Sequence, residues 1–190
     1  MAFFQPLKLG SLTLPNRIIM APLTRCRATP GTNAPNAMMA QMYAERASAG
    51  LLIAEATVIS EEARGFPNTP GAYSAEQTAG WKLVTEAVHK KGGRIFLQLW
   101  HQGRTASKDL NGGLVPVGPS PQADGSWANG FGGRGGEARE ATLEDFSRIV
   151  GDYKLCAQNA MAAGFDGVEL HAANGCVRVC QPPMGRCYLC

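Results

Sequence analysis

The fold of this chain is decided by residues 142–170, which read TLEDFSRIVGDYKLCAQNAMAAGFDGVEL. Thr142 and Asp145 are suited to begin a helix, and the apolar side chains that follow keep the 3.6-residue period of one helical face. Gly164 ends this pattern, and residues 167–170 then read as a strand. The stretch therefore predicts a long amphipathic helix that leads directly into a strand.

The same alternation of strand and helix runs through the preceding residues. Strands are predicted at residues 17–21, 51–59 and 94–100. Helices are predicted at residues 37–49, capped by Asn36, and from a Ser74–Gln77 capping box to Gly92. Continuous apolar strands separated by amphipathic helices indicate an α/β fold with a parallel sheet covered by helices. Residues 111–136 hold nine glycines and three prolines, which predicts a long loop with at most a short hairpin.

Composition excludes several classes of protein. The net charge is +3, of which residues 1–175 carry only +1, and this balance is too slight to indicate binding to nucleic acid. The longest apolar run, residues 51–59, is too short for a membrane span and contains Glu55. No secretory signal opens the chain, and residues 1–175 hold two cysteines, so we expect a reduced, cytoplasmic protein without membrane contact.

The length sets a further bound. A complete (β/α)8 barrel takes about 250 residues or more, whereas this chain has 190. The predicted strands begin about 50 residues apart, so eight such units would need roughly 350 to 400 residues, within the wide range of this fold. The sequence therefore predicts about four βα units, which is the amino-terminal half of a barrel.

In barrels of this kind the working residues lie at the carboxyl ends of the strands. There, a flat heteroaromatic ring can be hydrogen-bonded at its edge by threonine, glutamine and backbone amides, and neutral donors can stabilise negative charge on a carbonyl oxygen. We expect no metal ligands among these positions. The residues at the predicted strand ends are Pro22, Leu23, Thr24, Ala56, Gln98, Trp100, His171 and Asn174.

Four motifs carry a resemblance to a known family. They are NRIIMAPLTR at residues 16–25, EAT at 55–57, QLWHQGR at 98–104 and AGFDGVELHAANG at 163–175. In this order and spacing they resemble the old yellow enzyme-type ene-reductases, which include N-ethylmaleimide reductases and 12-oxophytodienoate reductases. The resemblance covers nearly all of residues 3–175.

The resemblance implies an FMN-containing TIM barrel that takes hydride from NAD(P)H and reduces the activated carbon–carbon double bond of a small-molecule enone. By resemblance, the flavin contacts are Pro22, Leu23, Thr24, Ala56 and Gln98. Trp100 lines the substrate pocket, and His171 and Asn174 bind the substrate carbonyl oxygen. Withdrawing charge towards that oxygen makes the β-carbon electrophilic, which agrees with the chemistry of these side chains.

The resemblance ends within one residue of Gly175. In the family the next residue is the tyrosine that protonates the α-carbon, whereas here it is Cys176. We interpret residues 1–175 as the half-barrel and 176–190 as a disordered tail from a shifted reading frame or aberrant splice joint. The tail holds four cysteines, Cys176, Cys180, Cys187 and Cys190. A zinc site and a C-terminal prenylation box are the alternative interpretations of these cysteines.

Two functions follow from this pattern. The first is an FMN-dependent ene-reductase. The alternative is a catalytically inactive half-barrel that lacks the proton-donor tyrosine and the FMN phosphate site, which the family carries in its later strands. In that case the open edges of the sheet favour self-association.

Overall fold

The computed structural model describes residues 1–121, 137–173, 180–181 and 186–187. Its centre is a four-stranded sheet in the order β3-β4-β5-β8, in which every neighbouring pair is parallel. The register pairs Met20 with Leu52, Leu52 with Ile95, and Leu97 with Val168. The strands are β3 (Ile19–Met20), β4 (Leu51–Val58), β5 (Ile95–Trp100) and β8 (Gly167–Leu170).

Three helices connect the strands, and their amino ends are capped as the sequence predicts. They are α1 (Ala37–Ala44), α2 (Ala75–Lys90) and α3 (Leu143–Ala162). Asn36 accepts a hydrogen bond from the Met39 N–H, and complete capping boxes begin α2 and α3. These caps pair amide groups that would otherwise lack partners in the first helical turn.

The first helix is shorter than predicted, because it ends at Ala44 and the expected end was Ala49. The Arg46 and Ala47 amides bond to carbonyl oxygens only three residues back, which tightens the chain into turns. Gly50 then passes so close to Asn16 that a Cβ there would lie 2.1 Å from the Asn16 carbonyl oxygen. The chain therefore leaves the helix early, because it must pack against the segment before β3.

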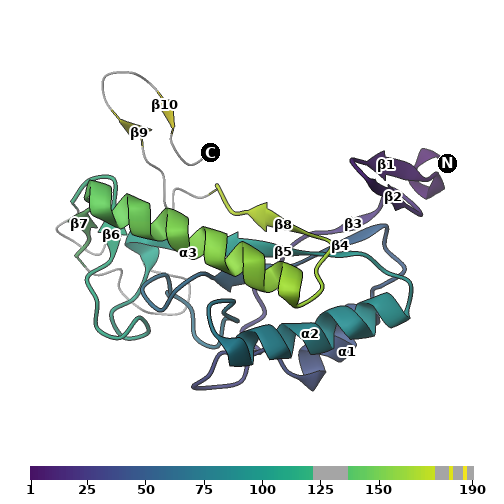
Figure 1. Ribbon diagram of the computed structural model, residues 1–190, viewed down its shortest axis with the longest axis horizontal. Coiled ribbons are helices and arrows are strands. Elements are labelled where there is room, and N and C mark those ends of the chain that lie inside the picture. Colours follow the sequence, from purple (N-terminus) through teal and green to yellow (C-terminus); the bar gives the residue numbers. More distant parts are fainter. Residues whose placement is uncertain (122–136, 174–179, 182–185, 188–190) are drawn as a thin grey trace.

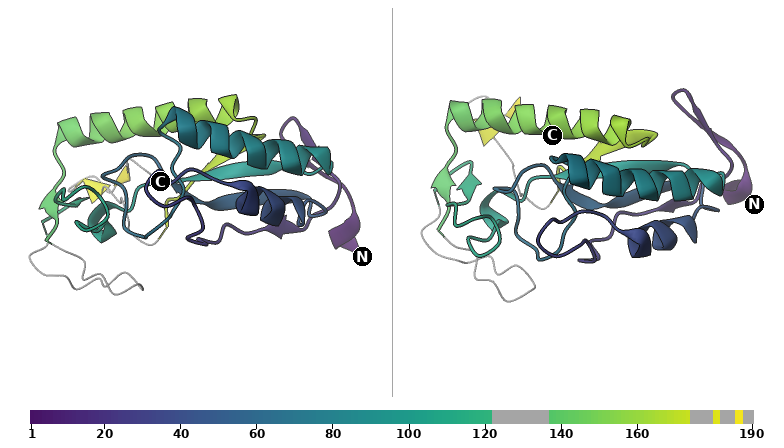
Figure 2. Two further views of the ribbon diagram at one scale, coloured as in Figure 1. Left: turned by 90° about the horizontal axis from the view of Figure 1, so that it is seen from below. Right: turned by 60° about the horizontal axis from the view of Figure 1, so that its bottom comes forward.

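All three helices lie on one face of the sheet (Figure 2). Alternate strand residues such as Leu97 and Leu99 point into the core between the sheet and helices, where Trp81 is fully buried. The Trp81 ring packs on Tyr43 and Phe165, with ring centroids 6.4 and 5.3 Å apart. The opposite face of the sheet carries the remaining strand residues. In a closed barrel, that face is the interior.

Smaller elements lie at the two ends of the sheet (Figure 1). At the amino end, a 3₁₀ turn (Ala2–Phe4) precedes an antiparallel hairpin of β1 (Leu7–Leu9) and β2 (Leu12–Leu14), which the sequence analysis did not predict. At the carboxyl end lie a second 3₁₀ turn (Gly103–Thr105) and the parallel pair β6 (Val117–Gly118) and β7 (Arg139–Glu140). Residues 122–136 of the predicted loop lie outside the described residues.

Within the tail, β9 (Cys180–Gln181) pairs antiparallel with β10 (Arg186–Cys187). Cys176 and Cys190, on which the zinc and prenylation interpretations depend, lie outside the described residues. Over the part of the chain that the structure describes, no helix has the length and apolar character needed to cross a membrane. Within the same residues, no group of three or more histidine, cysteine or acidic side chains is arranged to hold a metal ion.

Candidate active site

Aromatic side chains meet at the carboxyl end of the sheet, on the face away from the helices. Trp100, the last residue of β5, lies between Phe66 and His171. The Trp100 and His171 rings are stacked, with centroids 5.4 Å apart and planes inclined by 23°, and Phe66 lies 5.6 Å from Trp100. These contacts join residues from three successive βα units, and they leave Trp100 only 6% exposed.

A β-bulge brings Ala56 to the same group. Between Ala54 and Thr57, strand β4 gains one residue relative to β5. Ala54 belongs to the helix-facing core, whereas Ala56 packs against Trp100 and the partly buried Phe66 in a separate cluster. The bulge therefore redirects the strand at Ala56, the small residue that is expected from the sequence to lie beside a planar ligand.

Gln98 lies on the same face as Trp100, two residues earlier in β5. Its Nε2 donates a hydrogen bond to the Glu169 carboxylate of β8 over 2.6 Å. Glu169 is a site residue that the sequence analysis missed, although a glutamate inside a predicted strand is a signal for it. A ligand that accepts from the Gln98 amide must therefore compete with this carboxylate.

The segment after β3 contributes Pro22, Leu23 and Thr24. It has no regular secondary structure; Pro22 is half-buried, and Leu23 and Thr24 are exposed. A hydrogen bond from the Arg25 amide to a Glu55 carboxylate oxygen, 3.1 Å long, ties it to β4. The contact reaches β4 one residue before Ala56, so the segment and Ala56 belong to the same end of the sheet.

His171 is held by its backbone and presents an unpaired ring nitrogen. Its N–H donates to the Leu99 carbonyl oxygen over 3.0 Å, which extends the ladder beyond β8. Among the described residues, neither the buried His171 Nδ1 nor the buried Trp100 Nε1 has a hydrogen-bond partner. Leaving such atoms unpaired costs about 1–3 kcal/mol each, so they fit a site that receives a polar ligand. Asn174, the other predicted carbonyl-binding residue, lies outside the described residues.

A charged cluster supports the loops beside this group, and the sequence analysis did not predict it. Glu62, in the loop after β4, lies 2.6 Å from Arg148 of α3 and 3.9 Å from the His101 ring. The pKa of Glu62 is held below its usual range, mainly by His101 and to a smaller degree by Arg148. Arg148 also pairs with Asp145, near the start of α3. The cluster therefore joins the loops after β4 and β5 to that helix.

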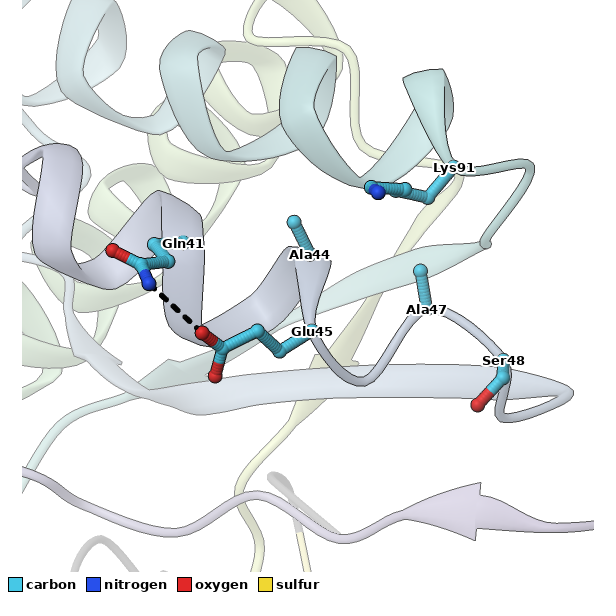
Figure 3. Close-up of a pocket in the computed structure, with 6 residues that line it drawn as sticks. All are labelled: Gln41, Ala44, Glu45, Ala47, Ser48 and Lys91. Carbon is cyan, nitrogen blue, oxygen red and sulfur yellow. Dashed lines mark hydrogen bonds between the residues drawn. The ribbon is translucent and has the colours of Figure 1, made fainter.

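The structure also has a cavity of about 510 Å³ at the opposite end of the sheet (Figure 3). It lies beside the carboxyl ends of α1 and α2, where Lys91 extends over it and Gln41 donates a 2.9 Å hydrogen bond to Glu45. Ser48 and Lys91 come shortly before β4 and β5, so this is the amino end of the strands. The cavity is therefore separate from the group around Trp100.

Comparison with known proteins identifies the family of the chain. Residues 2–177 match the model of the NADH:flavin oxidoreductase / NADH oxidase family. Flavin oxidoreductase hxnT of Emericella nidulans is 41% identical over 177 residues, which cover 90% of this chain and 46% of that protein. The 12-oxophytodienoate reductase 1 of Oryza sativa subsp. japonica is 41% identical over 172 residues, which cover 90% of this chain and 44% of that protein.

Solved structures agree. The old yellow enzyme homologue from Zymomonas mobilis superposes with a TM-score of 0.87 at 45% identity, over 93% of this chain and 50% of that chain. Morphinone reductase in complex with tetrahydroNAD gives a TM-score of 0.86 at 47% identity, over 93% of this chain and 51% of that chain. The predicted fold class, the amino-terminal half of a (β/α)8 barrel, is therefore confirmed.

This chain spans about half the length of the relatives that it matches. The match runs through all four strands of the sheet and through the described residues at their carboxyl ends. The predicted resemblance to old yellow enzyme-type proteins is likewise confirmed. The chain belongs to the NADH:flavin oxidoreductase / NADH oxidase family.

Proposed function

We propose that this chain is the amino-terminal half of an FMN-dependent ene-reductase barrel, which uses NAD(P)H to reduce the activated double bond of α,β-unsaturated carbonyls. The observation that carries the proposal is the convergence of Ala56, Gln98, Trp100 and His171 at one end and on one face of the sheet. Family membership supports the reaction class. Unpaired nitrogens of Trp100 and His171 support the binding of a polar ligand there.

For the flavin, we assign Pro22, Leu23, Thr24, Ala56 and Gln98 as the contacts. The small side chain of Ala56 would let a flat ring approach the backbone of β4 closely, and the exposed residues Leu23 and Thr24 of the segment after β3 would face its edge. The Gln98 amide is paired with Glu169, and it would donate to a ring acceptor in place of that carboxylate. When bound, FMN supplies the hydride that is transferred to the substrate's β-carbon.

For the substrate, we assign Trp100 to the pocket wall and His171 with Asn174 to the carbonyl oxygen. Trp100 stacks on His171 and so fixes the plane of the imidazole, which preorganises its nitrogens. A donor held at the carbonyl oxygen stabilises the negative charge that develops there as the β-carbon accepts hydride. The α-carbon then needs a proton. Cys176 stands where the family has its tyrosine donor, so we expect slow turnover.

A second candidate is a non-catalytic half-barrel that associates with itself. Among the described residues, β3 and β8 each pair with a neighbour on one side only. Ile18, Ile19 and Leu170 beside these edges are 44–57% exposed. Open edges with apolar side chains favour association with another chain. Light scattering coupled to size-exclusion chromatography, after incubation with FMN, tests this candidate. A dimer or larger species that elutes without flavin absorbance supports it over the enzyme.

The enzyme proposal is tested by titrating the purified chain with FMN, followed by flavin fluorescence, and then assaying enone-dependent NADPH oxidation. We expect saturable binding with slow but measurable turnover. Gln98→Ala should weaken FMN binding about tenfold, as loss of one buried hydrogen bond to a ligand does. Gln41→Ala, at the amino-end cavity, serves as the matched control and should bind like the parent chain. Absence of FMN binding by the folded parent chain would reject the enzyme proposal.

A further inference from the structure

Glu55 is a fully buried carboxylate to which the proposed chemistry gives no role. It lies in the β-bulge of β4, directly before Ala56. Burying an ionised carboxylate is costly unless hydrogen bonds compensate for the lost water. The contacts of Glu55 therefore indicate what this carboxylate does for the surrounding structure.

Each carboxylate oxygen of Glu55 accepts a hydrogen bond from a different part of the chain. One oxygen accepts from the Arg25 amide over 3.1 Å, and the other accepts from the Tyr43 hydroxyl over 3.2 Å. The Tyr43 hydroxyl oxygen in turn accepts from the Glu55 N–H over 2.8 Å. Tyr43 lies on α1 and is itself buried. Strand β4 and helix α1 therefore fix the side chain that holds the Arg25 amide.

The Arg25 amide belongs to the segment after β3, directly before a residue with a strained backbone conformation. Cys26 has a φ of +55°, in the left-handed region that non-glycine residues rarely adopt. Such a conformation persists where the surrounding structure holds it in place. The Glu55 hydrogen bond acts on the residue immediately before Cys26, so it restrains the backbone that carries Pro22, Leu23 and Thr24.

We propose that Glu55 is a positioning residue that holds residues 22–25 in the conformation needed to contact the flavin ring. This inference rests on the proposed FMN site. Tyr43 locks the Glu55 carboxylate, and the carboxylate fixes the segment through the Arg25 amide. Burial raises the pKa of Glu55, whereas the Arg25 amide and the Tyr43 hydroxyl oppose that rise and favour the ionised acceptor.

The competing explanation is that Glu55 only fastens α1 to β4 through Tyr43. Glu55→Ala removes both acceptors, whereas Glu55→Gln keeps one oxygen that can accept from the Arg25 amide. Tyr43→Phe removes the α1 contact and leaves the Arg25 contact in place. Thr85→Val is the matched control, because it deletes a buried hydrogen bond from the Thr85 hydroxyl to the Ala163 carbonyl oxygen at the amino end of the sheet.

The first readout needs no flavin. Hydrogen–deuterium exchange, resolved by NMR at the Arg25 amide, measures the restraint directly in the parent chain and in each variant. We expect Glu55→Ala to accelerate exchange at Arg25 at least tenfold relative to the parent. Glu55→Gln should restore most of the protection, and Thr85→Val should leave it within twofold. Unchanged protection at Arg25 in folded Glu55→Ala would overturn the proposal.

The second readout is the dissociation constant for FMN. We expect Glu55→Ala to weaken FMN binding at least tenfold, Glu55→Gln to restore binding to within threefold, and Thr85→Val to change it less than twofold. If the folded parent chain binds no FMN, the proposed function fails and, with it, the flavin-positioning role, while the exchange data still decide whether Glu55 restrains the segment. Equal loss of FMN affinity in Glu55→Ala and Thr85→Val would show that Glu55 acts only through stability.

Discussion

Asp145, near the start of α3, provides a test of how the carboxyl end of the sheet is held together. Its carboxylate accepts two hydrogen bonds from Arg139, over 2.6 and 2.8 Å, and one from Arg148 over 3.1 Å. It also accepts from the Thr142 amide and hydroxyl in the capping box. These contacts hold the pKa of Asp145 far below its usual range, and the contact with Arg139 has the largest effect. Asp145→Asn keeps the size of the side chain and removes its charge.

The expected loss of stability follows from these contacts. A hydrogen bond to a charged group contributes about 1.5–3 kcal/mol, but the Arg139 and Arg148 side chains are 43% and 42% exposed, so water screens both pairs. Each arginine contact then contributes about 1 kcal/mol to the free energy of unfolding. The cap contributes almost nothing to the difference, because asparagine still accepts from the Thr142 amide. We therefore expect Asp145→Asn to lower the free energy of unfolding by about 2 kcal/mol at pH 7. That corresponds to a fall in Tm of roughly 4–8 °C.

The pH dependence of this loss is the sharper measurement. The folded-state pKa of Asp145 lies below the unfolded value of about 3.9. The ionised carboxylate therefore contributes its full stability above about pH 5, and that contribution falls as the pH drops below about 4. Urea unfolding of the parent and Asp145→Asn, followed by tryptophan fluorescence at several pH values from 7 to 3, should show the difference between them shrinking with acid. A difference that stays constant from pH 7 to pH 3 would refute the reasoning.

Further predictions concern packing and reactivity. In Gly80→Ala on α2, the new Cβ would lie 2.5 Å from the Pro35 carbonyl oxygen, so we expect urea unfolding to show a loss of about 1–3 kcal/mol. In Gly151→Ala on α3, the new Cβ meets no atom within 4 Å, so the same assay should show a gain of about 0.5–1 kcal/mol; equal effects at the two glycines would contradict the packing described. Burial raises the pKa of Cys156 to about 12. Peptide mass analysis should therefore find Cys156 unmodified by iodoacetamide at pH 8 in the native chain and modified in urea, and equal rates in both would contradict its burial.

The parts of the fold that local sequence determines were predictable. Helices α2 and α3 begin at capping boxes and end near glycines, Gly92 and Gly164, whose φ values are +78° and +90°. The end of α1 was not predictable from local pattern, because a close approach to Asn16 sets it. The amino-terminal hairpin carried a readable signal in Gly10, which has a φ of +57° between two alternating apolar runs, and the sequence analysis missed it.

The grouping of the candidate site residues was predictable from the sequence, whereas the contacts that support them were less so. Strand order places Ala56, Gln98, Trp100 and His171 together because parallel strands end at one edge of the sheet. The bulge in β4 brings Ala56 to Trp100, but it cannot be predicted from the sequence pattern. Residues 54–58 are all buried, so no alternation of buried and exposed positions indicates where the strand changes register. Its presence depends on the register between two strands that lie far apart in the sequence.

The carboxylates that support the site were hidden for a related reason. Glu55, Glu62 and Glu169 each contact a group from another βα unit, and a glutamate within or beside an apolar strand carries no local indication of its partner. Their partners are the Arg25 amide, the Arg148 guanidinium and the Gln98 amide. Two of these contacts span 30 and 71 residues. Glu55 and Glu62 are buried and Glu169 is partly buried. Because removing a carboxylate from water is costly unless it is paired, each contact holds two chain segments in one relative position. Apolar periodicity therefore predicts the sheet, whereas long-range charged contacts fix the loops around the site.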